Sequence, residues 1–359
     1  MKSCYFLITP NCNLTCKYCF QRGDASTEYS PPQKIVADKQ TIDQFAVYCK
    51  TNGIGRVELF GGEPLLYRDS FLYAVRTLID QVPRIRLGVV TNGTLIDEEL
   101  MQLFEQEKIG ILLSLDGDRA RQNSMRGGFD RIAPWFDRLV ATGNTMVAMQ
   151  VGAADGVARN VRYVWGLGFP SVYLNIVQTY DWYNGEEDLN LFEAEYEAAL
   201  GAMFEGEGEL ACAISMHQML ERNRHKLMCG ITAKGLACDW RGLLYPCHRV
   251  PELGTKFSIG DIRDGVSERK NRLYRERINR QYFVKSASAR QYPLVSFCPV
   301  SVYQQHGSLN GSWNSMFCEM INIKAKIVAK HHYAIEEYRI KKRAKGKGSR
   351  PDKCIEPAF

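Results

Sequence analysis

The chain has 359 residues, of which 45% are hydrophobic and 24% are charged, and its formal net charge is +6. This composition is close to the average for globular proteins and excludes a disordered, collagen-like or coiled-coil chain, and the length suits two domains or one large α/β unit. Apolar runs of 18 residues are absent from the sequence, and a polar turn begins at Pro10. We therefore expect neither a membrane-spanning helix nor a signal peptide, and we expect a cytoplasmic protein.

The positive charge is concentrated at one end of the sequence. Residues 324–359 contain eleven Lys or Arg residues and four acidic residues, so the rest of the chain sums to about −1. A nucleic-acid binder that is basic over its whole surface is therefore poorly supported. The basic block at 339–353 has no apolar periodicity, which predicts a solvated or mobile tail, with a contact to an acidic partner as the alternative.

The first two hundred residues alternate short β-branched or aromatic runs with longer amphipathic stretches. The predicted strands are Cys4–Thr9, Arg56–Phe60, Ile85–Val90, Gly110–Leu115, Thr145–Val151 and Ser171–Val177. The predicted helices between them are Asp38–Asn52, Asp69–Gln81, Asp97–Glu107, Pro134–Thr142 and Val157–Leu167. This alternation predicts a parallel sheet with right-handed crossovers, and six such units predict a partial (β/α)6 TIM-like barrel with functional loops at the strand ends.

Beyond the sixth strand the pattern changes. Residues 178–191 have turn chemistry and predict a long loop, and helices are predicted at 192–205 and 209–223. A cysteine-rich region follows. We therefore expect a partial barrel over 1–205, a small cysteine-rich domain over 206–325, and a C-terminal helix with a basic tail over 326–359.

The sequence contains twelve cysteines. In a reducing compartment so many thiols indicate metal ligation rather than disulfides. Cys4, Cys49 and Cys212 lie in apolar or helical contexts and are predicted to be small core residues. Cys354 lies in the tail and is predicted to be a free thiol.

Three cysteines follow the first predicted strand directly. Cys12, Cys16 and Cys19 have the spacing C-x3-C-x2-C. A structural zinc site requires four ligands, and no fourth candidate lies nearby. Three thiolates on a four-iron cube would instead leave one iron open for a substrate or cofactor.

These cysteines, with Tyr18 just before the third, resemble the signature of the radical S-adenosylmethionine (SAM) enzymes. A second shared feature is the run Gly61-Gly62-Glu63-Pro64 after the second strand, which resembles the loop whose backbone and carboxylate grip the SAM amino group. The resemblance implies a SAM-binding [4Fe–4S] cluster at Cys12, Cys16 and Cys19.

Further features of the family appear at the ends of the third and fourth strands. The resemblance places Asn92 in the SAM site, and it implies that Ser114 and Arg126 hold the SAM carboxylate, for which a guanidinium fork is suited. The implied chemistry is reductive cleavage of SAM to a 5′-deoxyadenosyl radical, which abstracts a hydrogen atom from the substrate. An electron donor such as flavodoxin or ferredoxin would supply the reducing electron.

The region around Cys229, Cys238 and Cys247 resembles the SPASM or twitch extension of radical SAM enzymes, which holds auxiliary iron–sulfur clusters. Gly242 would permit the turn between two short strands. A zinc knuckle is the alternative interpretation. The sequence departs from the full SPASM pattern, so the resemblance implies one auxiliary cluster rather than two, or a second site that has lost its cluster. The cluster would be held by Cys229, Cys238 and Cys247, with Cys298, Cys318, His306 or an open site completing the set.

Radical SAM enzymes with such an extension largely modify peptides or proteins. We expect a maturase of ribosomally synthesised peptides that forms a crosslink or another C–H functionalisation. The alternative is formylglycine formation of the kind that anaerobic sulfatase maturases perform. In those enzymes an Asp proposed as the base follows the Gly-x4-Cys cysteine; here that residue is His248, which could act as a base. Cys354 could donate a hydrogen atom if the tail covers the barrel mouth.

The expected partner is a peptide or protein substrate. Because Cys12 lies so close to the start of the sequence, we expect no leader-recognition domain ahead of the barrel. Recognition would then fall to a separate leader-binding protein, to the loop 178–191 or to the basic tail, which suits an acidic leader. Two other classes remain open: an RNA-modifying enzyme, for which the tail lacks interleaved aromatic residues, and a non-catalytic iron–sulfur or zinc scaffold.

Overall fold

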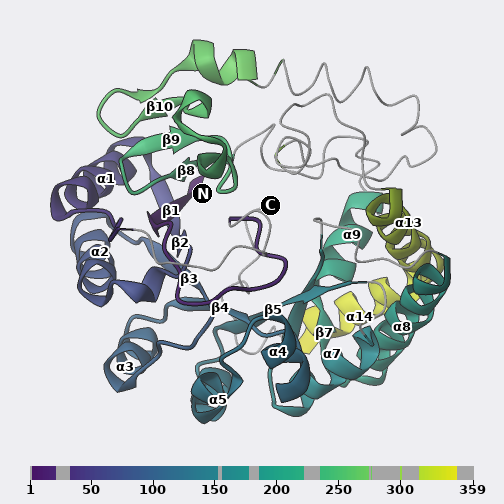
Figure 1. Ribbon diagram of the computed structural model, residues 1–359. Coiled ribbons are helices and arrows are strands. Elements are labelled where there is room, and N and C mark those ends of the chain that lie inside the picture. The colour runs from purple at the N-terminus through teal and green to yellow at the C-terminus, as the bar shows by residue number, and fades with distance from the viewer. Residues whose placement is uncertain are drawn as a thin grey trace.

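The computed structural model describes residues 2–21, 33–152, 156–177, 186–221, 235–274, 276, 300 and 315–345. The described strands form a single sheet in the order β11-β10-β9-β8-β1-β2-β3-β4-β5-β6-β7 (Figure 1). The strands are β1 (Lys2–Thr9), β2 (Ile54–Gly61), β3 (Arg86–Thr91), β4 (Gly110–Ser114), β5 (Thr145–Val151), β6 (Ser171–Ile176), β7 (Glu209–Leu210), β8 (Ala237–Cys238), β9 (Leu243–Tyr245), β10 (Gly260–Asp261) and β11 (Gly265–Val266).

The strands from β1 to β7 are all parallel, and each pairs with its neighbour in sequence. The sheet curves around a centre and carries helices on its outer side (Figure 1). The predicted partial TIM-like barrel is therefore confirmed. The carboxyl ends of its parallel strands meet at one rim, where functional loops of such barrels lie.

Helices connect the strands and cover the outside of the sheet. They are α1 (Lys39–Asn52), α2 (Arg68–Gln81), α3 (Glu98–Gln106), α4 (Arg119–Met125), α5 (Phe129–Ile132), α6 (Phe136–Ala141), α7 (Val157–Gly166), α8 (Glu186–Glu205), α9 (Ala211–Glu221), α13 (Ser315–Lys330) and α14 (His332–Lys345), with short 3-10 turns η1 (Pro64–Leu66), η2 (Ala133–Trp135), η4 (Val250–Leu253) and η5 (Thr255–Phe257). Asp38, Asp97 and Asp118 start α1, α3 and α4, because each side chain accepts a backbone N–H of the first turn.

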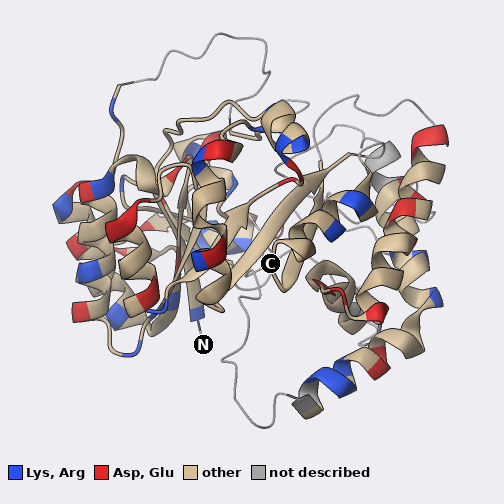
Figure 2. Cartoon of the chain, turned by 90° about the horizontal axis from the view of Figure 1, so that it is seen from below, with Lys and Arg blue, Asp and Glu red and all other residues tan. Residues whose placement is uncertain are grey.

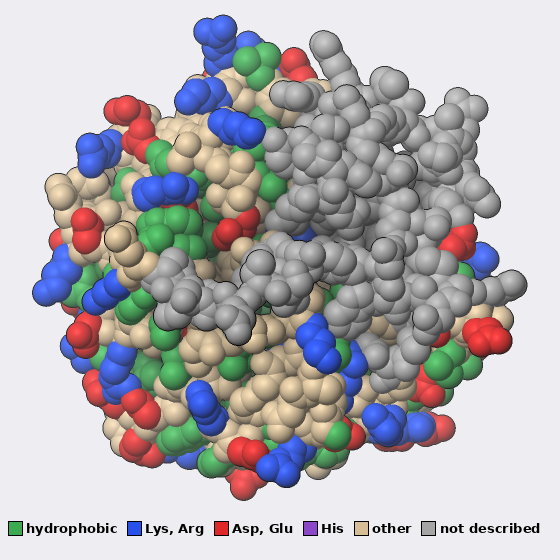
Figure 3. Space-filling model, in the orientation of Figure 1, with side chains coloured by type: hydrophobic (Ala, Val, Ile, Leu, Met, Phe, Trp, Pro, Cys, Tyr) green, Lys and Arg blue, Asp and Glu red, His purple; other side chains and the backbone are tan. Residues whose placement is uncertain are grey.

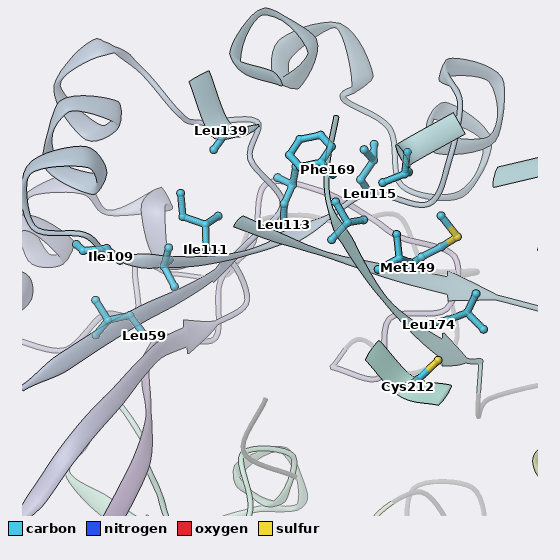
Figure 4. Packing of buried hydrophobic residues seen from close by; sticks show 14 of the residues in the cluster. Leu59, Ile109, Ile111, Leu113, Leu115, Leu139, Met149, Phe169, Leu174 and Cys212 are labelled. Carbon is cyan, nitrogen blue, oxygen red and sulfur yellow. The ribbon is translucent and has the colours of Figure 1, made fainter. Parts of the chain in front are cut away.

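The main core lies between the sheet and the outer helices. On β1, Cys4, Phe6 and Ile8 are buried on the helix side, and the Phe6 ring stacks on Phe45 of α1 with centroids 4.2 Å apart. The core continues on β4, β5 and β6, as Figure 4 shows for Leu113, Met149 and Leu174. The three cysteines predicted to be core residues are confirmed as such: Cys4, Cys49 and Cys212 are all buried.

The cysteine-rich region continues the barrel sheet. β8 pairs with β1 in parallel, and β9, β10 and β11 follow in antiparallel order. Gly242 makes the turn from β8 to β9 with a φ of +81°, a conformation that favours glycine. The turn predicted for Gly242 is therefore confirmed.

The C-terminal helices α13 and α14 pack against α8 and α9, on the opposite side of the barrel from β8 to β11 (Figure 1). Residues 339–345 of the predicted solvated or mobile tail belong to α14, and most of their described side chains are exposed. The Arg339 side chain is only 10% exposed and donates to Glu336 at 2.5 Å, and Lys342 pairs with Glu209 of β7. These contacts explain why a highly charged segment forms an ordered helix.

Two predicted boundaries also differ from the structure. Helix α8 begins at Glu186, so residues 186–191 are helical rather than part of the predicted loop, and 178–185 lie outside the described residues. The predicted domain boundary at 325 falls inside α13.

Lys, Arg, Asp and Glu residues are frequent along the outer helices, whereas the central strands consist mostly of other residues (Figure 2). On the face shown in Figure 3, the described Lys and Arg side chains are interspersed with Asp and Glu. Within the described part of the chain, no helix is both long enough and apolar enough to cross a membrane.

Candidate active site

The loop after β1 carries the three cysteines predicted to bind a cluster. Cys12, Cys16 and Cys19 form no disulfide bond, and all three are partly exposed. The N–H of Leu14 lies 3.4 Å from the Cys12 sulfur, and the Asn92 side-chain nitrogen lies 3.8 Å from it. Such N–H donors stabilise a thiolate and tune the potential of a cluster that it holds.

Side-chain amides connect this cysteine loop to the end of β3. Asn92 donates to the Asn13 oxygen at 3.0 Å, and Asn13 donates to the Thr94 hydroxyl at 2.9 Å. Thr94 in turn donates to the Asn92 oxygen at 2.7 Å, which closes the network. Asn92, a predicted SAM-site residue, is therefore buried within hydrogen-bonding reach of the cysteine loop.

The glycines after β2 let two backbones come close together. The N–H of Gly62 donates to Thr9 O, and the N–H of Glu63 donates to Asn11 O, both at 2.8 Å. A Cβ at Gly61 or Gly62 would overlap those carbonyl oxygens. The Gly-Gly pair is therefore required for the β2 loop to pack on the cysteine loop, whatever else it contacts.

The Glu63 carboxylate is buried and faces the end of β3. It accepts the Thr91 hydroxyl and the Asn92 N–H at 2.7 Å each, and the Leu65 N–H at 3.1 Å at the start of η1, where Pro64 lies. Burial raises the pKa of Glu63 to about 7, although these hydrogen bonds act to lower it. The Glu63 side chain thus connects the loop after β2 to the loop after β3 through hydrogen bonds.

At the end of β4, a second cluster of polar side chains lies beside the cysteine loop. The Tyr18 hydroxyl donates to Asp116, and Arg126 donates through Nε to the same carboxylate oxygen at 2.9 Å. The Arg126 guanidinium also lies 5.1 Å from the centre of the Tyr18 ring. Ser114, the last residue of β4, lies at the same rim and is partly buried. The structure therefore brings the predicted residues Ser114 and Arg126 to the rim where the cysteine loop lies.

Arg126 stays charged in this buried position. Burial alone would lower its pKa, but the charges of Asp116, Tyr18 and Cys16 outweigh burial and hold the pKa above its ordinary value. The guanidinium lies close to the cysteine loop, since it stacks over the Tyr18 ring of that loop. A fixed cation at this rim can receive an anionic group of a ligand.

Cys238 and Cys247, both predicted cluster ligands, lie on opposite faces of the sheet. Cys238 is the partner of Phe6 in the β1–β8 register and is buried on the helix side, where Cys4 and Cys49 act electrostatically on its thiol. Burial raises the pKa of the Cys238 thiol. Cys247 instead packs with Tyr5 and Val250 on the inner side. The structure therefore does not bring these two thiols together.

His248, the predicted base, lies in an aromatic environment on the inner side of the sheet. Its ring centroid is 4.5 Å from that of Tyr5, 5.0 Å from Phe60 and 6.5 Å from Phe20. Burial, and after it the charge of Arg249, lowers the pKa of His248 to about 3. The imidazole is therefore neutral near pH 7, and it lies between the end of β2 and the residue that follows Cys19.

The remaining predicted site residues cannot be placed. Cys229, Cys298, His306 and Cys354 lie outside the described residues. Cys318 falls in α13, but its side chain is outside the described part.

The cysteine loop carries the thiol ligands that an iron–sulfur cluster requires. In the described part of the chain, no three Cys, His, Asp or Glu side chains converge as ligands of a single ion. A four-iron cube binds each thiolate at a different corner and needs no such convergence. Three partly exposed thiols on a loop that is hydrogen-bonded to the loops after β2, β3 and β4 suit this arrangement.

A parallel partial barrel with a three-cysteine loop at its carboxyl rim is typical of enzymes that hold an iron–sulfur cluster and a ligand at the same rim. Residues 6–150 match the family model of the Radical SAM superfamily. Residues 6–150, which run from β1 to β5, therefore correspond to a radical SAM domain. When bound, the [4Fe–4S] cluster and SAM of this superfamily supply a carbon-centred radical.

Curated relatives share part of the sequence. The chain is 32% identical to the probable GTP 3′,8-cyclase of Methanocella arvoryzae over 168 residues, which cover 44% of this chain and 52% of that protein. It is 31% identical to the GTP 3′,8-cyclase of Chlorobaculum tepidum over 154 residues, 42% of this chain and 44% of that protein. The chain thus spans about half the length of these relatives.

Solved structures share more of the fold at lower identity. Native anSMEcpe with bound AdoMet superposes with a TM-score of 0.67 and 15% identity, over 97% of this chain and 100% of that chain. Streptococcus suis SuiB bound to the precursor peptide SuiA superposes with a TM-score of 0.61 and 14% identity, over 88% and 75%. These likenesses extend the shared fold beyond the barrel.

Sequence reasoning missed two features of the site. Asp116 lies two residues beyond the end of β4, and Asn92 directly follows β3, so the place of Asp116 near a strand end was the available signal. The contact of the Arg249 guanidinium with the Phe20 ring, at 4.5 Å, joins residues distant in sequence, and no local pattern indicates it.

Proposed function

We propose that this protein is a radical SAM enzyme that modifies a peptide or protein, as a maturase of ribosomally synthesised peptides does. The extent of the structural likeness carries this proposal. The fold resembles anSMEcpe over 97% of this chain, and anSMEcpe has also been solved with the Kp18Cys peptide bound. Another similar structure, that of SuiB, was solved with the precursor peptide SuiA bound.

In this proposal the rim of the barrel is the SAM site. Cys12, Cys16 and Cys19 hold the cluster, and Asn92 donates toward the Cys12 sulfur. The backbone of Gly61–Gly62, rather than the Glu63 carboxylate, is the part of that loop assigned to the SAM ammonium, because the Glu63 side chain is buried and accepts three protein donors.

The carboxylate of SAM is assigned to Ser114 and Arg126. Arg126 is a buried cation whose Nε is bound to Asp116. Its two terminal nitrogens form the end of a planar fork, which matches the two oxygens of a carboxylate.

A single auxiliary cluster remains part of the proposal. Cys247 is the described ligand candidate, since it is partly exposed and the Arg249 N–H lies 3.5 Å from its sulfur. Cys229, Cys298 and Cys318 are the other candidates. Cys238 is not carried forward, because it is buried on the opposite face of the sheet among core residues.

A second candidate substrate is GTP, because the curated relatives are named GTP 3′,8-cyclases. Those matches cover less than half of this chain, so they favour a shared radical SAM domain more than a shared substrate.

Isotope transfer into 5′-deoxyadenosine distinguishes the two substrates. The anaerobically reconstituted protein would be reduced with dithionite or reduced flavodoxin in the presence of SAM, with either a pooled library of fully deuterated peptides or deuterated GTP. Because the radical takes a hydrogen atom from the substrate, we expect 5′-deoxyadenosine to gain one mass unit with the peptides only.

The Cys16→Ala variant is the control for this assay, and it should form no 5′-deoxyadenosine with either pool. Deuterium transfer from GTP and none from any peptide would overturn the proposed peptide substrate and favour the second candidate.

A further inference from the structure

Asp116 connects the cysteine loop to the arginine at the barrel rim. One oxygen of its carboxylate, Oδ2, accepts both the Tyr18 hydroxyl and Arg126 Nε, the latter at 2.9 Å. The other oxygen, Oδ1, accepts the N–H of Gln150 on β5 at 2.9 Å. Asp116 is fully buried, and the Arg126 side chain is 10% exposed. A buried carboxylate with these three donors is held in one orientation.

The surroundings of Asp116 fix its position independently of the cysteine loop. The Asp116 N–H donates to the Gln122 side chain of α4 at 2.8 Å, and Gln122 is itself buried. Gly117 follows with a φ of +137°, and a Cβ there would overlap the amide of Asn160 on α7. Contacts within the barrel, on α4 and next to α7, therefore hold Asp116 in place.

Tyr18 is the residue of the cysteine loop that contacts Asp116. It lies between Cys16 and Cys19, and the neighbouring Lys17 N–H donates to Met125 O at the end of α4 at 3.0 Å. The Tyr18 ring is buried with Met125 and Val177, and the Arg126 guanidinium lies over it. The ordering of the cysteine loop and the orientation of Arg126 therefore both depend on hydrogen bonds to Asp116.

We propose that Asp116 is a positioning residue that links the ordering of the cluster loop, through Tyr18, to recognition of the amino-acid portion of SAM, through Arg126. This inference rests on the proposed function, which assigns the SAM carboxylate to Arg126. Loss of the Asp116 charge leaves the buried Arg126 without its counter-ion and removes the charge-assisted hydrogen bond that fixes its Nε.

Two non-reacting ligands separate this role from a general effect on the fold. S-adenosylhomocysteine carries the amino-acid portion, whereas 5′-deoxy-5′-methylthioadenosine lacks it. Both would be titrated into the cluster-loaded protein under anaerobic conditions by calorimetry, after iron content and circular dichroism have shown that each variant is folded and loaded.

The expected result is selective. Asp116→Asn should weaken S-adenosylhomocysteine binding roughly 10- to 100-fold, the range for a lost charged hydrogen bond, and leave methylthioadenosine binding within about twofold. Tyr18→Phe, which removes one hydroxyl, should weaken the first ligand about threefold or more. Its effect should be absent in the Asp116→Asn background, because the two groups share one bond. Asp130→Asn, which breaks the exposed pair with Arg119, should change neither ligand.

Equal weakening of both ligands by Asp116→Asn, or no weakening of either, would overturn the inference. An additive effect of Tyr18→Phe in the double variant would also overturn the link to the cluster loop. Arg126→Gln tests the proposed function separately. If it leaves S-adenosylhomocysteine binding unchanged, the assignment of the SAM carboxylate to Arg126 fails, whereas a selective loss with Arg126→Gln and none with Asp116→Asn refutes only the inference.

Discussion

At the residue scale, the ionisation of Glu63 should be visible in the pH dependence of stability. Burial raises its pKa from 4.5 to about 7, so the folded chain holds this proton more tightly than the unfolded chain does. Stability should therefore fall as the pH rises from about 5 to about 7, by up to about 3 kcal/mol from this group, and then level off. Anaerobic denaturant unfolding at several pH values measures this slope.

Glu63→Gln provides the comparison for this prediction. This variant carries a glutamine side chain that cannot ionise, so the part of the pH dependence of stability that Glu63 causes should disappear. It should also be less stable at every pH, because the amide nitrogen would face the N–H of Asn92 or the donors of Leu65 and Thr91. A variant with the same pH slope as the natural chain would show that Glu63 does not titrate in this range.

At the scale of the elements, the packing of the β2 loop on the cysteine loop depends on glycine. In Gly62→Ala the new methyl group would overlap the backbone of Pro10 and Asn11, so one loop must move. We expect a loss of stability of about 1–3 kcal/mol and weaker SAM binding, measured by denaturant unfolding and calorimetry.

Gly201→Ala is the matched control, since Gly201 lies inside α8 and a Cβ there meets nothing within 4 Å. It should raise the stability by about 0.5–1 kcal/mol and leave SAM binding unchanged. Equal behaviour of the two variants would contradict the packing argument.

The docking of α14 makes a second prediction at this scale. The buried Arg339 side chain bonds to Glu336 and lies 3.2 Å from His217 of α9, so Arg339→Ala should lower the stability by about 1–3 kcal/mol. Lys341, in an exposed pair with Glu337, is the control, and Lys341→Ala should change stability by less than about 0.5 kcal/mol. Thermal unfolding of both variants measures the difference, and a larger effect at Lys341 would refute the docking.

At the scale of the whole molecule, the end of the cysteine loop contacts the segment that carries Cys247. Arg249 lies over the Phe20 ring, and the Gln21 side chain donates to Glu252 at 3.3 Å. Because β8 also pairs with β1, the two cysteine regions belong to one continuous structure.

The sequence allowed the barrel to be predicted well, because regular alternation of apolar residues is a local property. The predicted strand Thr145–Val151 agrees with β5 at both ends. The helices α4 and α5 were missed, since both are short and are separated by Gly127 and Gly128, which resemble a loop.

The parts of the site that could not be predicted depend on contacts between distant residues. The spacing of Cys12, Cys16 and Cys19 is local and was sufficient to indicate the cluster loop. The face on which Cys238 lies depends on its register with Phe6, and a shift by one residue reverses that face. The contact of Tyr18 with Asp116 spans 98 residues of sequence.

The most direct test of the account is the formation of 5′-deoxyadenosine by the anaerobically reconstituted protein when it is reduced in the presence of SAM. We predict that the natural chain and Cys49→Ala, which removes a buried core thiol, both cleave SAM, and that Cys12→Ala, Cys16→Ala and Cys19→Ala do not. Cleavage of SAM by any of these last three variants at the natural rate would contradict the claim that these cysteines hold the cluster.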